Sequence, residues 1–295
     1  MAASMMHASR VGFGATSGSA ATVELDFLSC NVAKQGSHIQ SEGIRGLRDY
    51  ISELVNEGTF TVGGSLVMHP RPSELDLFLP QIMGGGTNPT YTLAETQTSF
   101  GIDVTKIGQI CRYAGLKVNS AVFRCAPNQP LTLEMDLQGT TETTGISFPA
   151  LTNVSNVAPY IFSELVLTLG GVAYQCFNIE IGIQNNLLLD RFMNTQSRTE
   201  LPEQSRVITL NATVQMTSVE AAALYDTAVA GITGTAVWTK GAYGLTFSFD
   251  KLQKPISPVV IANRNGEITL GLQFTARHNA TTPTKALIVT NDSTP

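Results

Sequence analysis

The chain is poor in charged residues, and its net charge is acidic rather than basic. Its 295 residues include 18 Lys and Arg against 23 Asp and Glu, which gives a formal net charge of −5. Proteins that bind nucleic acids tightly use clustered Lys and Arg to displace counterions from the phosphates. The composition therefore argues against tight binding of DNA or RNA.

Long apolar runs are also missing. A membrane-spanning helix needs about 20 nearly continuous apolar residues, whereas the apolar runs of this chain are short and interrupted by Thr, Gly, Asn or Glu. Residues 1–21 are small and polar, with Arg10 late in the segment and no apolar block. We therefore expect neither a membrane anchor nor a secretory signal.

Cysteine and histidine are few and scattered. The chain has four of each, without CxxC spacing: Cys30, Cys111, Cys125, Cys176, His7, His38, His69 and His278. We expect the cysteines to be buried, reduced thiols in a protein made in a cytosol. No two histidines have the spacing of metal ligands, so the sequence predicts no metal site.

Motifs for catalysis or cofactor binding are absent as well. The sequence contains no GxSxG nucleophile elbow. Gly12-Phe13-Gly14 lacks the remaining glycines of a dinucleotide-binding fingerprint. Gly84-Gly85-Gly86 follows an expected helix instead of opening one, which is typical of a helix C-terminus. We predict no catalytic residue, no cofactor and no enzymatic activity.

What the chain does contain is alternation of apolar and polar residues with period two. This pattern is typical of strands that bury one face. The clearest examples are residues 23–27, 131–138, 165–169, 208–216 and 268–275. Gly170-Gly171 follows one of them, and paired glycines permit the positive φ of hairpin turns, so residues 165–183 are predicted to form a hairpin.

Two helices are predicted between the strands. Apolar residues recur at helical spacing over residues 75–83, and Gly84 provides a stop signal. Pro80 lies inside this helix and should kink or shorten it. A second amphipathic helix is predicted over residues 219–229, behind the capping residue Thr217.

The same order of elements occurs twice along the chain. Thr59–Met68 aligns with Val207–Met216, with Thr61 on Thr209, and each segment is followed by a predicted helix and further strands. A shared order of this kind favours duplication. The sequence thus predicts a mainly β protein of two tandem β-sandwich domains, each with one flanking α-helix. The predicted boundaries are an N-terminal arm 1–20, a first sandwich 21–145, a linker 146–160 that is rich in Thr, Asn and Pro, and a second sandwich 161–295.

Two long loops occupy equivalent places in the two halves. Lys34–Glu57 and Gln184–Gln204 are longer than ordinary connections, and both mix apolar side chains with Arg and acidic groups, a composition typical of interfaces. The candidate interface residues are Ile44, Arg45, Leu47, Arg48 and Tyr50 in the first loop and Leu187, Leu188, Arg191 and Phe192 in the second. In the second loop, Arg191, Arg198 and Glu200 could pair across an interface. The alternative is that each loop folds onto its own sandwich.

The sequence resembles tail tube proteins of tailed bacteriophages, of the long-tailed, non-contractile type. The resemblance rests on the block Glu57–Gly85 (EGTFTVGGSLVMHPRPSELDLFLPQIMGG), on FGIDV at Phe100, and on the later alternating strands. It implies a β-sandwich flanked by one helix, whose sheets join around a ring into a barrel with a central channel for DNA. It also implies that the long loop, here Lys34–Glu57 and by duplication Gln184–Gln204, contacts the next ring.

The duplication modifies what the resemblance implies. Two sandwiches per chain would make a trimeric ring with pseudo-six-fold symmetry rather than a hexamer. The expected partners are further copies of the chain and other tail proteins, with DNA passing through the channel without specific binding. The expected location is the virion tail, assembled in the host cytoplasm. The alternatives are another ring-forming tail part, such as a hub or terminator, or a carbohydrate-binding, adhesin-like β-sandwich. Trp238 is the only tryptophan, which weakens the last alternative.

Overall fold

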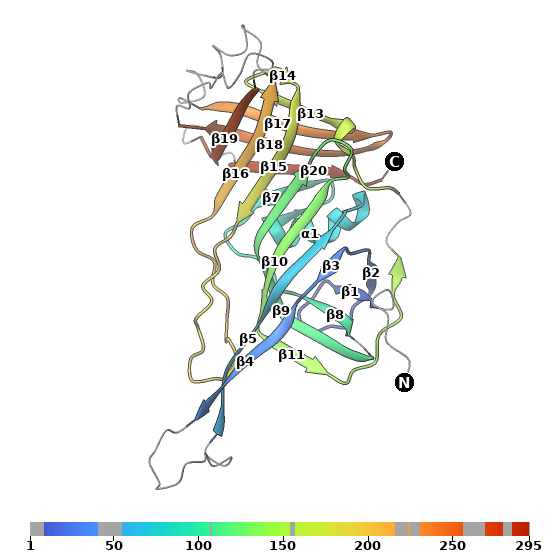
Figure 1. Ribbon diagram of the computed structural model, residues 1–295, viewed down its shortest axis with the longest axis vertical. Coiled ribbons are helices and arrows are strands. Elements are labelled where there is room, and N and C mark those ends of the chain that lie inside the picture. Colours follow the sequence, from blue (N-terminus) through green and yellow to red (C-terminus); the bar gives the residue numbers. More distant parts are fainter. Residues whose placement is uncertain are drawn as a thin grey trace.

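The computed structural model is mainly β, as predicted (Figure 1). The residues that it describes are 9–40, 55–106, 108–153, 157–215, 224, 231–255, 269–279 and 285–294. We call the residues up to Thr144 the first half and those from Leu165 the second half. In Figure 1 the first half fills the lower part of the molecule and the second half the upper part.

Strands make up most of both halves. Those of the first half are β1 Val11–Gly14, β2 Val23–Leu25, β3 Ser29–Cys30, β4 Ala33–Gln40, β5 Val55–Met68, β6 Gly84–Thr87, β7 Thr90–Leu93, β8 Phe100–Lys106, β9 Gln109–Cys125, β10 Thr132–Gly139 and β11 Thr141–Thr144. A short strand, β12 Thr152–Asn153, lies between the two halves in the sequence. Those of the second half are β13 Leu165–Leu169, β14 Val172–Tyr174, β15 Cys176–Gln184, β16 Val207–Gln215, β17 Ile232–Lys240, β18 Tyr243–Gln253, β19 Thr269–Arg277 and β20 Leu287–Asp292.

The predicted alternation is present in the burial of these strands. In β10, Leu133, Met135 and Leu137 are fully buried, whereas the residues between them are partly exposed. The strands β16 and β19 show the same pattern. Each of these strands therefore has one face on the core and one face turned away from it.

The helix α1, Pro72–Met83, confirms the first predicted helix. The Glu74 carboxylate accepts a hydrogen bond from the Arg71 backbone N–H at 2.9 Å, which satisfies a donor at the helix start. Pro80 does not shorten the helix, which continues to Met83 because its last turn is buried in the core. Gly84, at φ +82°, ends it in the left-handed conformation. The second predicted helix lies outside the described residues except for Leu224, which is helical and 2% exposed.

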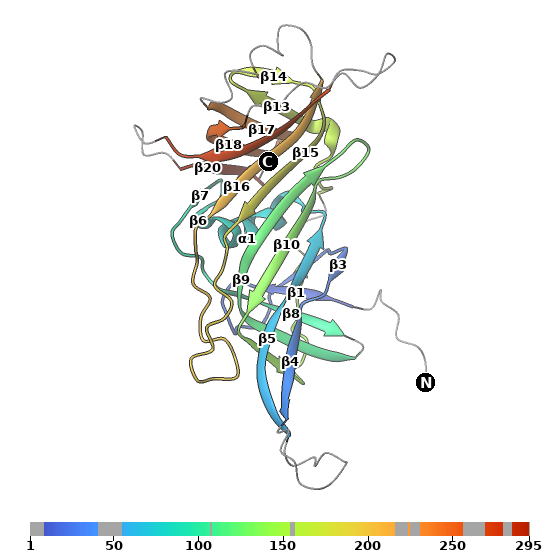
Figure 2. The same cartoon turned by 60° about the vertical axis from the view of Figure 1, so that its left-hand side comes forward.

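One continuous antiparallel sheet connects the two halves (Figure 2). Its strands pair in the order β4, β5, β10, β9, β15, β16 and β19. The contact between the halves within this sheet is the pairing of β9 with β15, from Cys125 opposite Ile179 to Ser120 opposite Gln184. We call this pairing the β9·β15 joint.

The long strand β9 also belongs to a second layer. Its first part pairs with β8 and β11, and β8 in turn pairs with β1 and β1 with β2. From Lys117 onward β9 pairs with β10 instead. The core between the two layers includes Phe13, Phe78 and Phe100, and the Phe13 ring lies 5.2 Å from that of Phe78 and 5.5 Å from that of Phe100. The first half is thus a β-sandwich with α1 in its core.

The order of strand pairing in the first half recurs in the second. Pairing runs β4, β5, β10, β9, β8, β1, β2 in one half and β15, β16, β19, β18, β17, β13, β14 in the other. In the same way, β11 pairs with the first part of β9 and β20 with the first part of β18.

A shared irregularity fixes which residues correspond. Phe100 pairs with Leu116 and the register then shifts, and Ile232 pairs with Leu252 before the same kind of shift. Leu116 and Leu252 therefore correspond, as do the next residues, Lys117 and Gln253. Lys117 pairs with Gln138, which pairs with Gly63, and Gln253 pairs with Thr275, which pairs with Thr209. Gly63 thus corresponds to Thr209. The sequence alignment of Thr61 with Thr209 is therefore two residues out of register. Residues two apart in an alternating strand resemble each other, so sequence alone does not fix the register.

Three connections differ from the prediction. The hairpin turn at Gly170 and Gly171 is present, both glycines having positive φ, but its second strand β14 ends at Tyr174 and the chain then enters the joint. The predicted linker is not free, because β12 pairs in parallel with β2. The hairpin β6–β7 extends the second half's sheet by pairing with β20.

Candidate assembly surfaces

The β4–β5 ribbon, formed by Ala33–Gln40 and Val55–Gly63, projects from the lower end of the molecule (Figures 1 and 2). On its outer side β4 pairs with no strand in the part of the chain that the structure describes. The side chains of residues 34–40 are exposed, and they include the apolar Ile39 at 61%. Val55 on the opposite strand is 39% exposed. An isolated two-stranded ribbon is only marginally stable.

The corresponding loop of the second half follows a different course. Residues Asn185–Arg206, which we call the strap, run downward from β15 and β16 and lie against the first half (Figure 1). At the root of the strap, the Asn185 side-chain amide is buried and donates to the backbone oxygens of Ile82 and Val118 at 3.2 and 3.0 Å. Arg206 donates to the Asn185 side-chain oxygen at 2.9 Å, and burial lowers the pKa of its guanidinium.

An ion pair and a buried arginine hold the middle of the strap. The Lys117 ammonium on β9 lies 2.7 Å from the Glu203 carboxylate and donates to the Leu201 backbone oxygen at 3.0 Å. Burial opposes the charge of Glu203, but the hydrogen bonds from the Lys117 ammonium and from the Gln97 and Glu203 backbone N–H groups together outweigh it, so the pKa of Glu203 lies below its usual value. Arg198 is 7% exposed and donates to the Gln138 side-chain oxygen at 2.9 Å.

The tip of the strap covers a free edge of β5. The strand β10 pairs with β5 only from Val62 to Met68, so residues 55–61 of β5 have no β10 partner on that edge. There the Phe60 backbone N–H donates to the Gln196 backbone oxygen at 2.8 Å, and the Gln196 side-chain amide donates to the Glu57 backbone oxygen at 3.1 Å. Covered edges do not pair with other chains. The strap therefore protects the inner edge of the ribbon while the outer edge, on β4, stays open.

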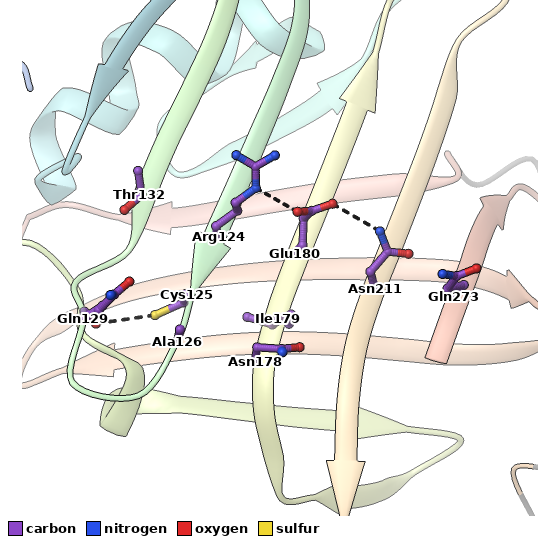
Figure 3. Close-up of a pocket in the computed structure, with 10 residues that line it drawn as sticks. All are labelled: Arg124, Cys125, Ala126, Gln129, Thr132, Asn178, Ile179, Glu180, Asn211 and Gln273. Atoms are coloured by element: carbon purple, nitrogen blue, oxygen red, sulfur yellow. Dashed lines mark hydrogen bonds and ion pairs between the residues drawn. The ribbon is translucent and has the colours of Figure 1, made fainter. Parts of the chain in front are cut away.

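The face of the sheet that points away from the core carries a polar row across the β9·β15 joint (Figure 3). Arg124 pairs with Glu180 at 2.7 Å, and Glu180 also accepts from the Asn211 amide at 3.2 Å. Arg124 pairs in addition with Glu134, at 2.5 Å. These contacts lower the pKa of Glu180, chiefly through the hydrogen bond from Arg124. The row borders an open depression of about 490 Å³ that is lined mainly by polar side chains.

A second polar cluster fastens the end of the chain to α1. The Asp76 carboxylate accepts hydrogen bonds from Tyr91 and Asn291, both at 2.7 Å, and Asn291 is fully buried. Asn88 and Ser293 donate to the same carboxylate. Burial, together with the hydrogen bond to Asp76, raises the pKa of the Tyr91 hydroxyl. This cluster joins the first half's helix to the second half's β20.

A family model described as phage tail tube protein matches residues 6–276 of the chain. The chain belongs to the phage tail tube protein family. The match covers most of both halves, so the two recurring β-structures lie within one family match. Membership of this family makes the chain a structural component of the phage tail tube. The search of curated proteins finds no match.

Within the described ranges, no three His, Cys, Asp or Glu side chains gather as a metal site requires, and no helix there is long and apolar enough to cross a membrane. All four cysteines are free, as predicted. Cys111 and Cys125 are buried, whereas Cys30 and Cys176 are half-buried, and burial raises the pKa of the Cys176 thiol to about 11.

The structure describes only some of the interface residues predicted from the sequence. Those of the first loop, Ile44, Arg45, Leu47, Arg48 and Tyr50, lie outside the described residues. In the strap, Leu187 is 6% exposed and its backbone N–H donates to the Asn119 side-chain oxygen at 2.9 Å. Leu188, Arg191 and Phe192 are half-buried. The predicted ionic partners meet within the chain, since Arg191 pairs with Glu200 at 2.9 Å and Arg198 is buried against β10.

Sequence reasoning missed the residues on the first half that receive the strap. Lys117, Asn119 and Gln138 occupy ordinary outward positions of alternating strands. In the structure, Asn119 is the extra residue of a bulge, since Asp136 pairs with Ser120 and Leu137 with Val118. A bulge re-aims a side chain, but the sequence does not mark it.

Proposed function

We propose that this tail tube protein assembles into rings of three chains with pseudo-six-fold symmetry, which stack into the tube of a long-tailed, non-contractile phage. In this proposal each chain contributes two tandem sandwiches, and the halves bounded by residues 21–145 and 161–295 alternate around the ring. The genome passes through the central channel during delivery. The tube is assembled in the host cytoplasm and joins other tail proteins at its ends.

The observation that carries the proposal is the β9·β15 joint. Two halves with the same strand order already meet edge to edge within one chain, in a continuous sheet. If the same contact is repeated between chains, the sheets extend around a ring. A repeated heterologous contact forms a closed ring when the rotation from one unit to the next is a whole fraction of a full turn. Six similar units per ring then require three chains.

The polar face of this sheet is suited to lining a channel for DNA. On β16 it presents Thr209, Asn211 and Thr213, which are uncharged. Two cations on this face, Arg124 and Lys117, are each paired with a carboxylate. A wall of unpaired cations would bind phosphates and release counterions, which holds DNA in place. Paired cations instead allow the duplex to slide.

We propose a role in ring stacking for the β4–β5 ribbon and the loop that it carries, including Ile44, Arg45, Leu47, Arg48 and Tyr50. The strap residues Leu187, Leu188, Arg191 and Phe192 lie against their own chain in the structure. Replacing residues 41–54 by a short Gly-Ser linker should therefore leave ring formation intact and stop elongation into tubes. Normal tubes from this variant would contradict the stacking role.

Electron microscopy of the purified protein tests the whole proposal. We expect rings and tubes in negative stain, and a three-dimensional reconstruction with three chains and six similar units per ring. Six chains per ring would overturn the trimer. Single rings that never stack would favour a hub or terminator, and monomers at high protein concentration would favour the carbohydrate-binding alternative.

A further inference from the structure

A pocket of about 360 Å³ lies where the two halves meet, beside the root of the strap. The first half contributes Leu93, at the end of β7, and Glu95 just after it. The second half contributes Ile208 of β16 and Ala276 of β19, and the strap contributes Arg206. Pockets of this size at the junction of two structural units commonly bind small ligands.

The connection between β19 and β20 forms one wall of the pocket. In the first half, the chain passes from β10 to β11 through Thr140 alone, whereas residues 278–286 separate β19 from β20 in the second half. The longer connection brings His278, Lys285 and Ala286 to the pocket. This wall therefore has no counterpart in the first half.

Backbone contacts with β18 fix both ends of this wall. The Asp250 carboxylate accepts a hydrogen bond from the Asn279 N–H at 2.6 Å. The Asp250 backbone N–H donates to the Ala286 oxygen at 3.3 Å. The two anchors hold the neighbouring His278 and Lys285 at the pocket.

The buried side chains that line the pocket are apolar, and most of its charged side chains are exposed. Leu93, Ile208 and Ala276 are 7%, 4% and 8% exposed. Glu95 and Lys285 are exposed. A ligand with an apolar part would gain free energy by covering the apolar side chains, while its charged end stays near the rim.

Arg206 brings a half-buried guanidinium to this pocket. A guanidinium has five N–H groups. The Arg206 Nε donates to the Asn185 side-chain oxygen at 2.9 Å and Nη2 donates to the Ala94 backbone oxygen at 2.6 Å, and no other acceptor bonds it among the described residues. These two bonds fix the plane of the guanidinium. The N–H groups that remain on Nη1 and Nη2 form the fork that binds a carboxylate at two points.

The charges around the pocket favour a ligand with one negative charge. Arg206 and Lys285 are cationic and Glu95 is anionic, which leaves a local surplus of one positive charge in a chain whose net charge is −5. A dianion such as phosphate would be repelled more strongly by Glu95 and would leave the apolar side chains uncovered.

We propose that this pocket binds an organic monoanion, a carboxylate on a short aliphatic stem. The carboxylate lies on the free fork of Arg206, with Lys285 nearby, and the stem lies against Leu93, Ile208 and Ala276. The bound molecule would contact both halves and the strap root at once. The proposal does not depend on ring assembly, so either can fail without the other.

Calorimetric titration of the purified protein with hexanoate tests the proposal. We expect saturable binding. Hexanamide has the same stem without the charge and should bind at least about tenfold more weakly, because the charge-assisted hydrogen bonds to Arg206 are lost. Inorganic phosphate should also bind more weakly than hexanoate. Failure of hexanoate to bind, equal binding of hexanamide, or tighter binding of phosphate would overturn the proposal.

Two exposed residues of opposite charge provide matched variants that locate the bound molecule. Lys285→Gln should weaken hexanoate binding about two- to fivefold, and Glu95→Gln should strengthen it by a similar factor. Lys34→Gln removes a lysine of the distant β4 and should leave the affinity unchanged. Hexanoate should also slow hydrogen exchange over residues 93–95 and 276–279. Equal affinities in all three variants, with no change in exchange there, would place the ligand elsewhere and overturn the assignment.

Discussion

The strands β4 and β15 hold the same position in the two halves, yet their surroundings are opposite. β15 lies between β16 and β9, and its isoleucines Ile179, Ile181 and Ile183 are buried. β4 pairs with β5 alone in the described residues, and its side chains from Lys34 to Gln40 are exposed. The contact inside the chain is thus built on apolar side chains. The outer edge of β4 instead presents backbone groups and, apart from Ile39, polar side chains.

This difference separates folding from assembly. Burial of the β15 isoleucines stabilises the single chain, and the covalent connection keeps the halves together at any dilution. Apart from Ile39, the exposed side chains of β4 are polar, so pairing at its edge would gain most of its interaction energy only when many hydrogen bonds form together in the right register. Lys34 on that edge also discourages random strand pairing. In the described residues, the chain thus has a packed internal contact at β15 and an outer edge of β4 with which no strand pairs.

The two long loops repeat the contrast. The strap is anchored to the first half by buried groups, Asn185, Arg198 and the pair of Lys117 with Glu203. Among the described residues, β4 has no such anchor on its outer side, where no strand pairs with it. The strap is thus an internal brace, whereas no described strand covers the outer edge of the β4–β5 ribbon.

The largest expected difference between the equivalent strands is in their contribution to stability. Ile181→Ala should lower the free energy of unfolding by about 2–5 kcal/mol, because it leaves a cavity in the core of the joint. Lys34→Ala should change it by no more than about 1 kcal/mol, since it removes only the contact of the ammonium with the Phe60 ring, 4.0 Å away. Urea denaturation of the two variants measures both values. Similar losses in the two would show that β4 is as much a part of the monomer's core as β15.

Loss of the buried Arg198 should destabilise the strap, whereas loss of the half-buried Arg191 should have little effect. Arg198→Ala leaves the Gln138 oxygen and the Val62 oxygen without their donor, so we expect a loss of about 1–3 kcal/mol and faster hydrogen exchange over residues 190–200. Arg191→Ala breaks a partly exposed ion pair and should change the free energy by about 0–1 kcal/mol. Hydrogen exchange with mass spectrometry compares the two variants directly. Unchanged exchange in Arg198→Ala would mean that the strap is held by its other contacts.

The smallest expected effect is a dependence of the joint on pH. The pKa of Glu180 is lower in the folded protein than in the unfolded chain, because Arg124 hydrogen-bonds the ionised carboxylate. This contribution is fully present above the unfolded pKa and is lost as the pH falls through the lower, folded pKa. Since both side chains are well exposed, we expect less than about 1 kcal/mol.

Arg124→Met provides the control for this pH effect. Denaturation at pH 7 and at pH 3 should show a smaller difference in the variant than in the unmodified protein. An identical difference in both proteins would show that the ion pair across the joint contributes nothing to stability. The variant Lys34→Ala, which leaves the pair of Arg124 with Glu180 unchanged, should keep the full pH dependence.

Local features of the fold could be predicted well because they depend on neighbours in the sequence. Alternation in residues 131–138 and 208–216 indicated β10 and β16, and helical spacing over residues 75–83 indicated α1. Features that depend on distant segments were missed. The pairing of β7 with β20 and of β12 with β2 has no local signal, because short polar strands resemble loops.

The candidate surfaces were predictable only as regions. Loop length and composition indicated Lys34–Glu57 and Gln184–Gln204 as unusual, but not that the second lies on the first half of its own chain. The decisive partners, such as Gln138 for Arg198, are single polar residues on the outward faces of strands. Many such residues exist along the chain, and only the packing of one element on another selects among them.

The sequence by itself determined that the chain is mainly β and that its elements recur. These properties follow from composition and from periods of two and 3.6 residues, which are local. Only the tertiary structure decided which strand edges are filled and which remain open. Every strand has the same backbone donors and acceptors whatever its side chains, so the occupancy beside β15 and the lack of a described partner beside β4 depend on where distant segments meet.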